Sequence, residues 1–360
     1  MTGTSPYSDL EPAAFWRRAV AEPGIFGLSG LWRSCWVLPS DARFVTYGSC
    51  FAQHISRALV ARGLNWLNAE PAPPGLPEAE ARRFNYGIFS ARTGNIYTAR
   101  QLLHWARLAA DPARAGQEEI WTEPEGRHRP ALCPVIEPDG FASAAEAAAA
   151  LEGTARAFRR SVVEADVFVF TLGLTEGWRN RQTGAPYAMC PGTIAGSFDA
   201  GQHVFENAGY PSVRADLEEA AGLLRGLNPA LRVLLTVSPV PLTATASGSH
   251  VLPATVYSKS TLRAVAGDLA ADMPEIDYFP SYEIIAAPPA RAAFFAPNLR
   301  SVEPPGVSLV MSHFFAGLDL GGPARGGPPT RPADAADIDA SLAEEDVVCE
   351  ESSLGAAHDV

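Results

Sequence analysis

Two unbroken apolar runs constrain the fold of this 360-residue chain more than any other feature. They are Val167–Phe170 and Val233–Val237, and a helical pattern over about 212–227 separates them. Strands that are apolar throughout are typical of parallel sheets whose two faces are both covered by helices. We therefore expect an α/β protein with three layers, in which a mostly parallel sheet lies between two layers of helices.

The same alternation of strands and helices extends over the rest of the chain. Shorter β-favouring segments predict further strands at Phe44–Tyr47, Leu64–Leu67 and Ile276–Phe279. Residue patterns and flanking turn residues predict helices over about 51–62, 97–108, 142–160, 258–271 and after Pro305. We expect Ser258 to be the N-cap of the fourth of these helices.

The chain divides into three parts. Residues 1–40 are an N-terminal extension, with a short helix near 12–21 and tryptophans that we expect to pack on the body. Residues 41–316 form the body, with a hairpin inserted near 120–134 around the turn Glu123–Gly126. Residues 317–360 are rich in Gly, Pro, Ala and acidic residues, which predicts a disordered acidic tail.

Charge and cysteine content exclude several classes of partner. The net charge is −12, and nine acidic residues lie between Asp334 and Asp359, which leaves about −3 for the rest of the chain. This balance argues against nucleic acid as a partner. The five cysteines form no CxxC pair, so we expect neither a disulfide framework nor a metal site. No apolar run reaches 18 residues and no signal peptide is visible, so we expect no membrane span and a cytoplasmic location.

Three turns that follow predicted strands are the natural place for a binding site. They are Gly48–Cys50, Gly173–Glu176 and Ser238–Pro241. In open parallel sheets, ligands bind outside the carboxyl ends of the strands, and we expect these turns to meet there. The chain contains no GxGxxG, no phosphate-binding GxxxxGK[ST] and no HExxH sequence, so the usual nucleotide and zinc-protease motifs are absent.

The first two of these turns carry the candidate chemistry. Cys50 is a candidate nucleophile, because the amide groups at the start of a helix favour a thiolate; a small buried core cysteine is the alternative. Ser49 is a competing nucleophile or an N-cap. In the second turn, Gly173 permits close backbone approach and Thr175 is a candidate donor to an oxyanion, with Glu176 beside it. Ordinary turn chemistry is the alternative for that segment.

Five blocks of sequence, in order, resemble the GSCFA family. The first block, Gly48–Ala52, reads GSCFA, and the others lie at 85–97, 171–176, 236–241 and 257–260, so that the resemblance covers about residues 35–316. The family resembles the SGNH/GDSL hydrolases. That resemblance implies a flavodoxin-like three-layer fold and an activity like that of esterases, lipases or carbohydrate O-acyltransferases.

The resemblance also implies roles for individual residues. Cys50 falls on the nucleophile position of the superfamily's Gly-Asp-Ser block. Gly94, followed by Asn95, matches the glycine whose N–H binds the oxyanion, and Thr175 stands where the Gly-x-Asn-Asp block has its asparagine. The Asp-x-x-His block is replaced by Asn298–Ser301, which supplies neither acid nor base. A missing general base costs roughly 10²–10⁴ in rate.

Other histidines are candidates for the missing base. His203, in a loop-like stretch after the third block, is the first of them, with a surface or structural role as the alternative. His54 follows Cys50 by one helical turn, and His250 and His313 are weaker candidates.

These features predict an SGNH-like ester hydrolase or O-acyltransferase that acts on a carbohydrate or a small acylated molecule through an acyl-enzyme. Lys259 and Arg263 are candidates to bind a carboxylate, a phosphate or the pyrophosphate of a cofactor, with a solvated helix start as the alternative. No cofactor is expected, although acyl-CoA is the natural donor for a transferase. The alternative function is a non-catalytic glycan-binding scaffold that lacks the acid–base pair. A thiol redox sensor at Cys50 has less support, since no second cysteine lies nearby in sequence.

Overall fold

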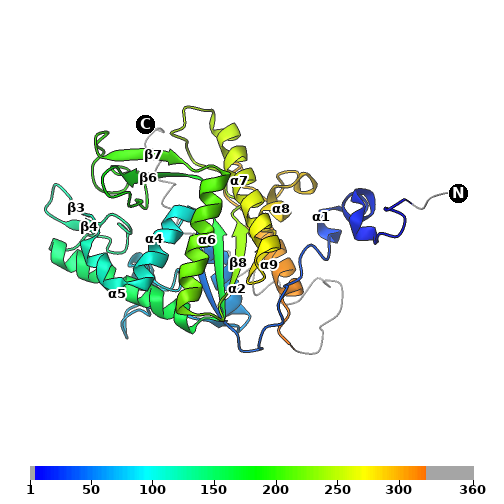
Figure 1. Ribbon diagram of the computed structural model, residues 1–360, viewed down its shortest axis with the longest axis horizontal. Coiled ribbons are helices and arrows are strands. Elements are labelled where there is room, and N and C mark those ends of the chain that lie inside the picture. The colour runs from blue at the N-terminus through cyan, green and yellow to red at the C-terminus, as the bar shows by residue number, and fades with distance from the viewer. Residues whose placement is uncertain (1–4, 322–360) are drawn as a thin grey trace.

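The computed structural model describes residues 5–321 and has a single central sheet of five parallel strands (Figure 1). In spatial order the strands are β2 (Asn65–Trp66), β1 (Arg43–Gly48), β5 (Val167–Leu172), β8 (Arg232–Val237) and β9 (Ile276–Phe279). Counted along the chain within this sheet, the order is 2-1-3-4-5, which is that of flavodoxin-like folds. The predicted parallel sheet is confirmed.

Alternate side chains of each central strand enter different layers. In β5, Phe168 and Phe170 belong to one apolar cluster, whereas Val167 and Val169 belong to another. Because successive side chains of a strand point to opposite faces, an unbroken apolar strand needs a covering layer on both sides. The three-layer α/β/α architecture follows directly from this pattern.

Helices from different parts of the chain form the two covering layers (Figure 1). One layer contains α4 (Ala99–Ala110), α5 (Ala144–Glu164), α6 (Tyr210–Leu227) and α7 (Val251–Asp272). The other contains α2 (Ala52–Ala61), α8 (Ser281–Ala286) and α9 (Pro304–Gly317). Short elements connect them: α3 (Glu78–Arg83), η3 (Pro112–Gln117) and η4 (Pro288–Ala290). No helix within residues 5–321 is long and apolar enough to cross a bilayer.

The start of α7 differs from the prediction. The helix begins at Val251, and the Nδ1 atom of His250 accepts a hydrogen bond from the amide of Leu252 as its cap. Ser258, expected at the N-cap, is therefore buried in the middle of the helix. Pro253 lies in the first turn of the helix, where its missing N–H breaks no hydrogen bond. The proline is therefore compatible with a helix that begins at Val251.

Two antiparallel hairpins are inserted in this fold. The expected one pairs β3 (Ile120–Thr122) with β4 (His128–Pro130). The second pairs β6 (Glu176–Asn180) with β7 (His203–Asn207) and was not anticipated.

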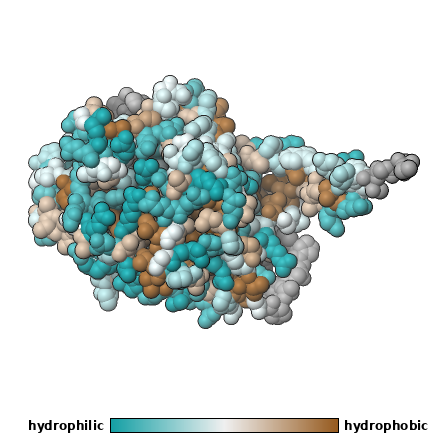
Figure 2. Space-filling view, viewed as in Figure 1, coloured by the Kyte–Doolittle hydropathy of each residue, from teal (hydrophilic) through white to brown (hydrophobic). Residues whose placement is uncertain are grey.

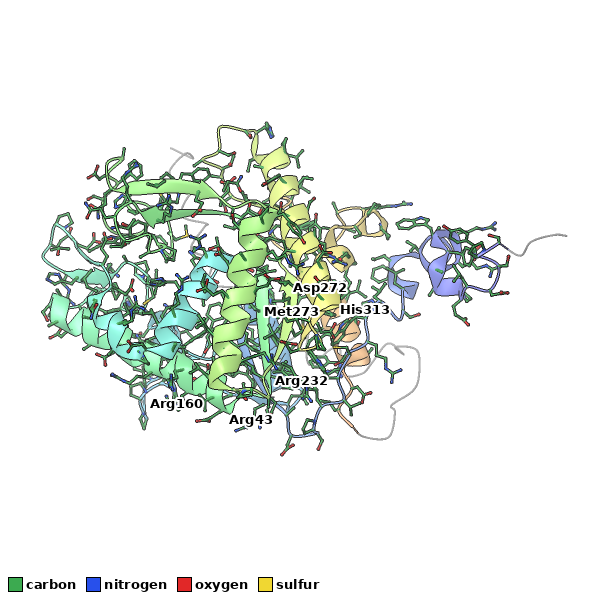
Figure 3. All side chains as sticks on the ribbon, in the orientation of Figure 1. Arg43, Arg160, Arg232, Asp272, Met273 and His313 are labelled. Carbon is green, nitrogen blue, oxygen red and sulfur yellow. The ribbon has the colours of Figure 1, made fainter. Side chains whose placement is uncertain are left out.

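Arg43 and Arg232, the first residues of β1 and β8, lie at the lower edge of the sheet in Figure 3. The carboxyl ends of the strands therefore lie at the opposite edge, toward the β6–β7 hairpin (Figure 1).

The N-terminal extension consists of two unlike halves. The later half packs on the body, where the Trp32 ring stacks on Phe314 with ring centroids 5.8 Å apart. The earlier half, with η1 (Pro12–Ala14), η2 (Arg17–Ala21) and α1 (Gly24–Gly27), projects from the body (Figure 1) and exposes apolar surface (Figure 2). Within it, Trp16 is 63% and Phe26 78% exposed.

The expected boundary of the acidic tail at residue 317 falls inside ordered structure. The amide of Leu38 donates to the carbonyl oxygen of Asp319, and the amide of Ser34 donates to that of Gly317. The chain therefore runs along the N-terminal extension as far as Gly321. The remainder of the predicted tail, residues 322–360, lies outside the described residues.

Candidate functional site

The turn that ends β1 holds both candidate nucleophiles. Gly48 has a backbone φ of +129°, and the amide of Ser49 donates to the carbonyl oxygen of Thr171 over 2.9 Å. The amides of residues 52, 53 and 54 then donate to the carbonyl oxygens of 49, 50 and 51, which forms the tight first turn of α2. Cys50 thus lies at the amino end of this helix and is 4% exposed.

Gly173 brings the end of β5 into direct contact with this turn. A Cβ atom at this position would lie 3.0 Å from the Cβ of Ser49 and 3.1 Å from the carbonyl oxygen of Tyr97. That same oxygen accepts hydrogen bonds from the amides of Gly173 and Leu174, at 2.9 and 3.0 Å. Only glycine fits without displacing the Ser49 side chain, so the two strand ends meet at van der Waals distance.

The segment with Gly94 and Asn95 also reaches the point where the Gly48–Cys50 turn meets Gly173, which we call the corner. The amide of Ile96 donates to the carbonyl oxygen of Gly48 over 2.8 Å, which fixes the segment beside the candidate nucleophiles. Asn95 is 3% exposed, and its Oδ1 atom lies 3.5 Å from Nε2 of Gln53 in the first turn of α2. The backbone of Gly94 is left-handed, with φ of +67°.

Lys259 enters the corner from α7. Its side chain is 1% exposed, and its Nζ atom donates to the carbonyl oxygen of Gly173 over 2.7 Å. Arg263, one helical turn further on, does not join it. The Arg263 guanidinium pairs with Glu283 and lies 4.1 Å from the centre of the Tyr278 ring. Of the two predicted basic residues, Lys259 therefore lies at the strand ends, whereas Arg263 is held by Glu283 and Tyr278.

Two buried hydroxyl groups mark this corner. Within residues 5–321, neither Oγ of Ser49 nor Oγ1 of Thr171 has a hydrogen-bond partner. Both residues are at most 2% exposed. Buried polar atoms are nearly always hydrogen-bonded, so unsatisfied groups are uncommon and tend to occur at functional positions.

Thr175 and Glu176 are occupied by other contacts. The hydroxyl of Thr175 donates to Oδ1 of Asn207 over 2.7 Å, so its one proton is not available to an oxyanion in this arrangement. The Glu176 carboxylate accepts hydrogen bonds from the hydroxyl of Thr245 and the amide of Ala246, at 2.6 and 3.3 Å. Thr175 therefore anchors the β6–β7 hairpin, and Glu176 anchors the loop that follows β8.

A cavity of about 190 Å³ lies between that hairpin and that loop. Its walls are mainly aromatic and aliphatic side chains from β6, β7, the segment 187–193 and the loop 242–246, including Trp178, Tyr187, Met189, Phe205 and Leu242. Tyr97 and Leu174 form the wall nearest the Gly48–Cys50 turn. The sequence prediction missed this cavity. Glu176–Asn180 and His203–Asn207 show no strict alternation of apolar and polar residues, so the β-favouring Trp178, Val204 and Phe205 were the only local signal for the hairpin.

Comparison with known proteins identifies the family of this chain. Residues 43–314 match the family model described as the GSCFA family. The chain belongs to the GSCFA family. No curated protein and no solved structure matches it.

The predicted base of this GSCFA protein is placed differently from expectation. His203 is the first residue of β7 rather than part of a loop, and its Nδ1 atom accepts the amide proton of Asp199 at 3.0 Å. In the tautomer that accepts this hydrogen bond the ring proton is on Nε2, so the lone pair of Nδ1 is engaged by a backbone amide. The ring packs edge-on against Tyr187, with centroids 5.1 Å apart. In this geometry His203 supports a wall of the cavity.

The other histidines have structural surroundings. Burial lowers the pKa of His54 to about 3, and its ring packs edge-on against Phe51. His250 caps α7. His313 lies on α9, far from the β6–β7 hairpin in Figure 3, and burial lowers its pKa as well. Both His54 and His313 are therefore neutral near pH 7.

The segment Asn298–Ser301, expected where an acid and a base would stand, forms a closed turn. Oδ1 of Asn298 accepts the amide protons of Arg300 and Ser301, each at 2.9 Å, and its Nδ2 donates to the hydroxyl of Ser301. In the part of the chain that the structure describes, no group of three or more His, Cys, Asp or Glu side chains is placed to hold a metal ion.

Proposed function

We propose that this GSCFA protein takes an acyl group from an ester through a covalent intermediate on Cys50, and passes it to water or to a hydroxyl acceptor. The observation that carries the proposal is the convergence on the Gly48–Cys50 turn. The Gly94 segment is hydrogen-bonded to Gly48, and Gly173 lies against Ser49. The turn opens a helix, whose amino end favours a thiolate.

The chemical steps use these groups in order. The Cys50 thiolate adds to the ester carbonyl carbon, a carbon–sulfur bond forms, and the π electron pair moves to the carbonyl oxygen. The backbone N–H groups of Cys50 and Gly94, with the Asn95 side-chain amide, stabilise this oxyanion; one such donor contributes roughly 10²–10³ in rate. When the carbonyl re-forms, the bond to the alcohol oxygen breaks and the alkoxide takes a proton from water. Water or an acceptor hydroxyl then attacks the thioester carbonyl carbon, and its proton passes to solvent. The carbon–sulfur bond breaks as the carbonyl re-forms, and its electron pair returns to the Cys50 thiolate.

Lys259 has a positioning role in this scheme. Its ammonium group fixes the carbonyl of Gly173, and that glycine sets how closely the end of β5 approaches Ser49. Thr175 and His203 act through the hairpin that they hold and take no part in the bond-making steps.

Acylation by an aryl acetate, followed by intact-protein mass spectrometry, tests the proposal. We expect an acetyl adduct in the wild type that Cys50→Ala removes and Ser49→Ala retains. Cys35→Ala and Cys190→Ala are matched thiol controls that should keep the adduct. Burial and Asp277 raise the pKa of Cys35 to about 11, and burial raises that of Cys190, so neither is a ready thiolate. An adduct lost only in Ser49→Ala would move the nucleophile to the neighbouring hydroxyl, and no adduct in the wild type would refute the acyl-enzyme.

A non-catalytic binding scaffold is the second candidate. It is favoured by the closed turn at Asn298 and Ser301, which provides neither an acid nor a base. This reading predicts that neither aryl acetates nor acyl-CoA acylate the protein, while an unmodified glycan binds with equal affinity to the wild type and Cys50→Ala.

A further inference from the structure

The cavity beside the candidate nucleophile is built before any ligand arrives. The hydroxyl of Tyr187 donates to Glu119 over 2.8 Å, and its carbonyl oxygen accepts from Nε2 of Gln101 at 2.7 Å. The Trp178 ring packs against Phe205 with centroids 5.5 Å apart. Walls that are already fixed cost little ordering free energy when a ligand binds. The cavity is therefore a preformed binding site rather than a gap between mobile side chains.

The charge of its walls selects against anions. Among the described residues that line the cavity, Glu176 alone carries a charge, and the rest of the wall is largely apolar. A carboxylate or phosphate placed here would lose its hydration, face a second negative charge and meet no cation of the wall. An uncharged apolar group would lose only its contact with water, which is favourable.

Tyr97, Leu174 and Gly173 connect the cavity to the Gly48–Cys50 turn. Tyr97 and Leu174 line the cavity, and the carbonyl oxygen of Tyr97 accepts the amides of both Gly173 and Leu174. Gly173 in turn lies against Ser49, next to Cys50. A carbonyl carbon held at the Gly48–Cys50 turn would therefore have its substituent directed past Leu174 toward this cavity.

We propose that the cavity holds the uncharged, apolar acyl chain of the substrate, and that this chain has about six carbon atoms. An apolar cavity of about 150 Å³ accepts benzene, and this one measures about 190 Å³. The proposal rests on the proposed acyl-enzyme function and names the substrate class of that same site. Esters with a medium-length alkyl chain or a phenyl ring in the acyl part fit this site, and dicarboxylate half-esters do not.

Binding of unreactive amides tests the cavity separately from catalysis. Titration calorimetry would measure butanamide, pentanamide and hexanamide against the full-length Cys50→Ala protein, with hexanoate as the charged analogue. Each added methylene should raise the affinity about fourfold, because burial of one methylene is worth about 0.8 kcal/mol. Hexanoate should bind roughly tenfold or more weakly than hexanamide, since its charge is desolvated.

Two exposed wall residues allow the cavity to be filled without disturbing the core. Ala244→Trp and Ala246→Trp add an indole at its mouth, and Ala200→Trp is the matched control on an exposed residue outside it. We expect the first two variants to lower hexanamide affinity at least tenfold and the control to leave it unchanged. Affinity that does not depend on chain length, or that neither wall variant changes, would overturn the proposal.

Acylation by acetyl and hexanoyl aryl esters, compared with hexanamide binding, separates this proposal from the proposed function. Hexanamide that binds as expected while no ester acylates Cys50 would refute the acyl-enzyme and leave the cavity assignment intact. Conversely, acylation that is equally fast for acetyl and hexanoyl aryl esters, with no hexanamide binding, would leave the enzyme and remove its acyl pocket.

Discussion

Gly48 offers the sharpest test of how the candidate site is built. Its backbone φ is +129°, and a Cβ atom there would lie 2.4 Å from the carbonyl oxygen of Thr171 and 2.6 Å from its nitrogen. These are backbone atoms of the neighbouring strand, which is hydrogen-bonded on both sides and has no rotamer with which to move aside. The substitution Gly48→Ala therefore forces apart β1 and β5 at the point where the nucleophile turn begins.

The expected loss of unfolding free energy has two parts, a backbone cost and an overpacking cost, and Gly63→Ala is the control for alanine at a positive φ without overpacking. Gly63, at the end of α2, has a φ of +66° and no atom within 4 Å of an added Cβ. Gly63→Ala therefore incurs only the cost of a left-handed alanine, about 1–2 kcal/mol. Gly48→Ala adds overpacking of about 1–3 kcal/mol, so it should lower the free energy of unfolding by about 2–5 kcal/mol in all.

Urea unfolding followed by circular dichroism and tryptophan fluorescence measures both variants. We expect Gly48→Ala to unfold at a clearly lower urea concentration than Gly63→Ala, with the same dependence of free energy on urea. At a concentration where both are folded, acetyl adduct formation should fall in Gly48→Ala alone, because its turn is displaced. Equal unfolding free energies for the two variants would show that the close approach of Gly48 to Thr171 is not a constraint on the fold.

Two further predictions concern the hairpin and the buried histidines. Thr175→Val should lower the free energy of unfolding by about 0.5–1.5 kcal/mol, because the hydrogen bond to Oδ1 of Asn207 is lost. Thr243→Val, at a hydroxyl that has no partner within residues 5–321, should be nearly neutral in urea unfolding. Equal losses would contradict the role given to the Thr175 hydrogen bond. The pKa of His54 is lowered from 6.5 to about 3, so below pH 6.5 the unfolded chain binds a proton that the native state does not. The free energy of unfolding therefore decreases as the pH is lowered, by up to about 1.4 kcal/mol per pH unit, until the native state also binds the proton. His54→Leu should reduce that slope between pH 6 and 4.5 by about one proton, with His313 supplying a remaining slope of the same sign; an unchanged slope would show that His54 is not buried as a neutral group.

The main elements of the fold were predictable because their signals are local. Apolar runs such as Val167–Phe170 indicate a strand that is buried on both faces, and a sheet of such strands requires a layer of helices on each face. The prediction went wrong where two local signals competed. Ser258 is a good N-cap residue, yet the helix already spans it, because Pro253 is compatible with a first turn and His250 supplies the cap. The β6–β7 hairpin was missed because its strands are short and 22 residues of loop, from 181 to 202, separate them.

For the candidate site, the sequence by itself determined which backbone turns meet, and the tertiary structure decided what each side chain is free to do. Gly48–Cys50 and Gly173 lie together because the carboxyl ends of parallel strands share one edge of the sheet. The hydroxyl of Thr175 is bound by Asn207, and Nδ1 of His203 by the amide of Asp199. Hydrogen-bond partners of this kind depend on how the hairpin packs in three dimensions, and the pattern of apolar and polar residues along the chain does not predict that packing. The apolar cavity has the same origin, since its walls come from five segments that only the folded protein brings together.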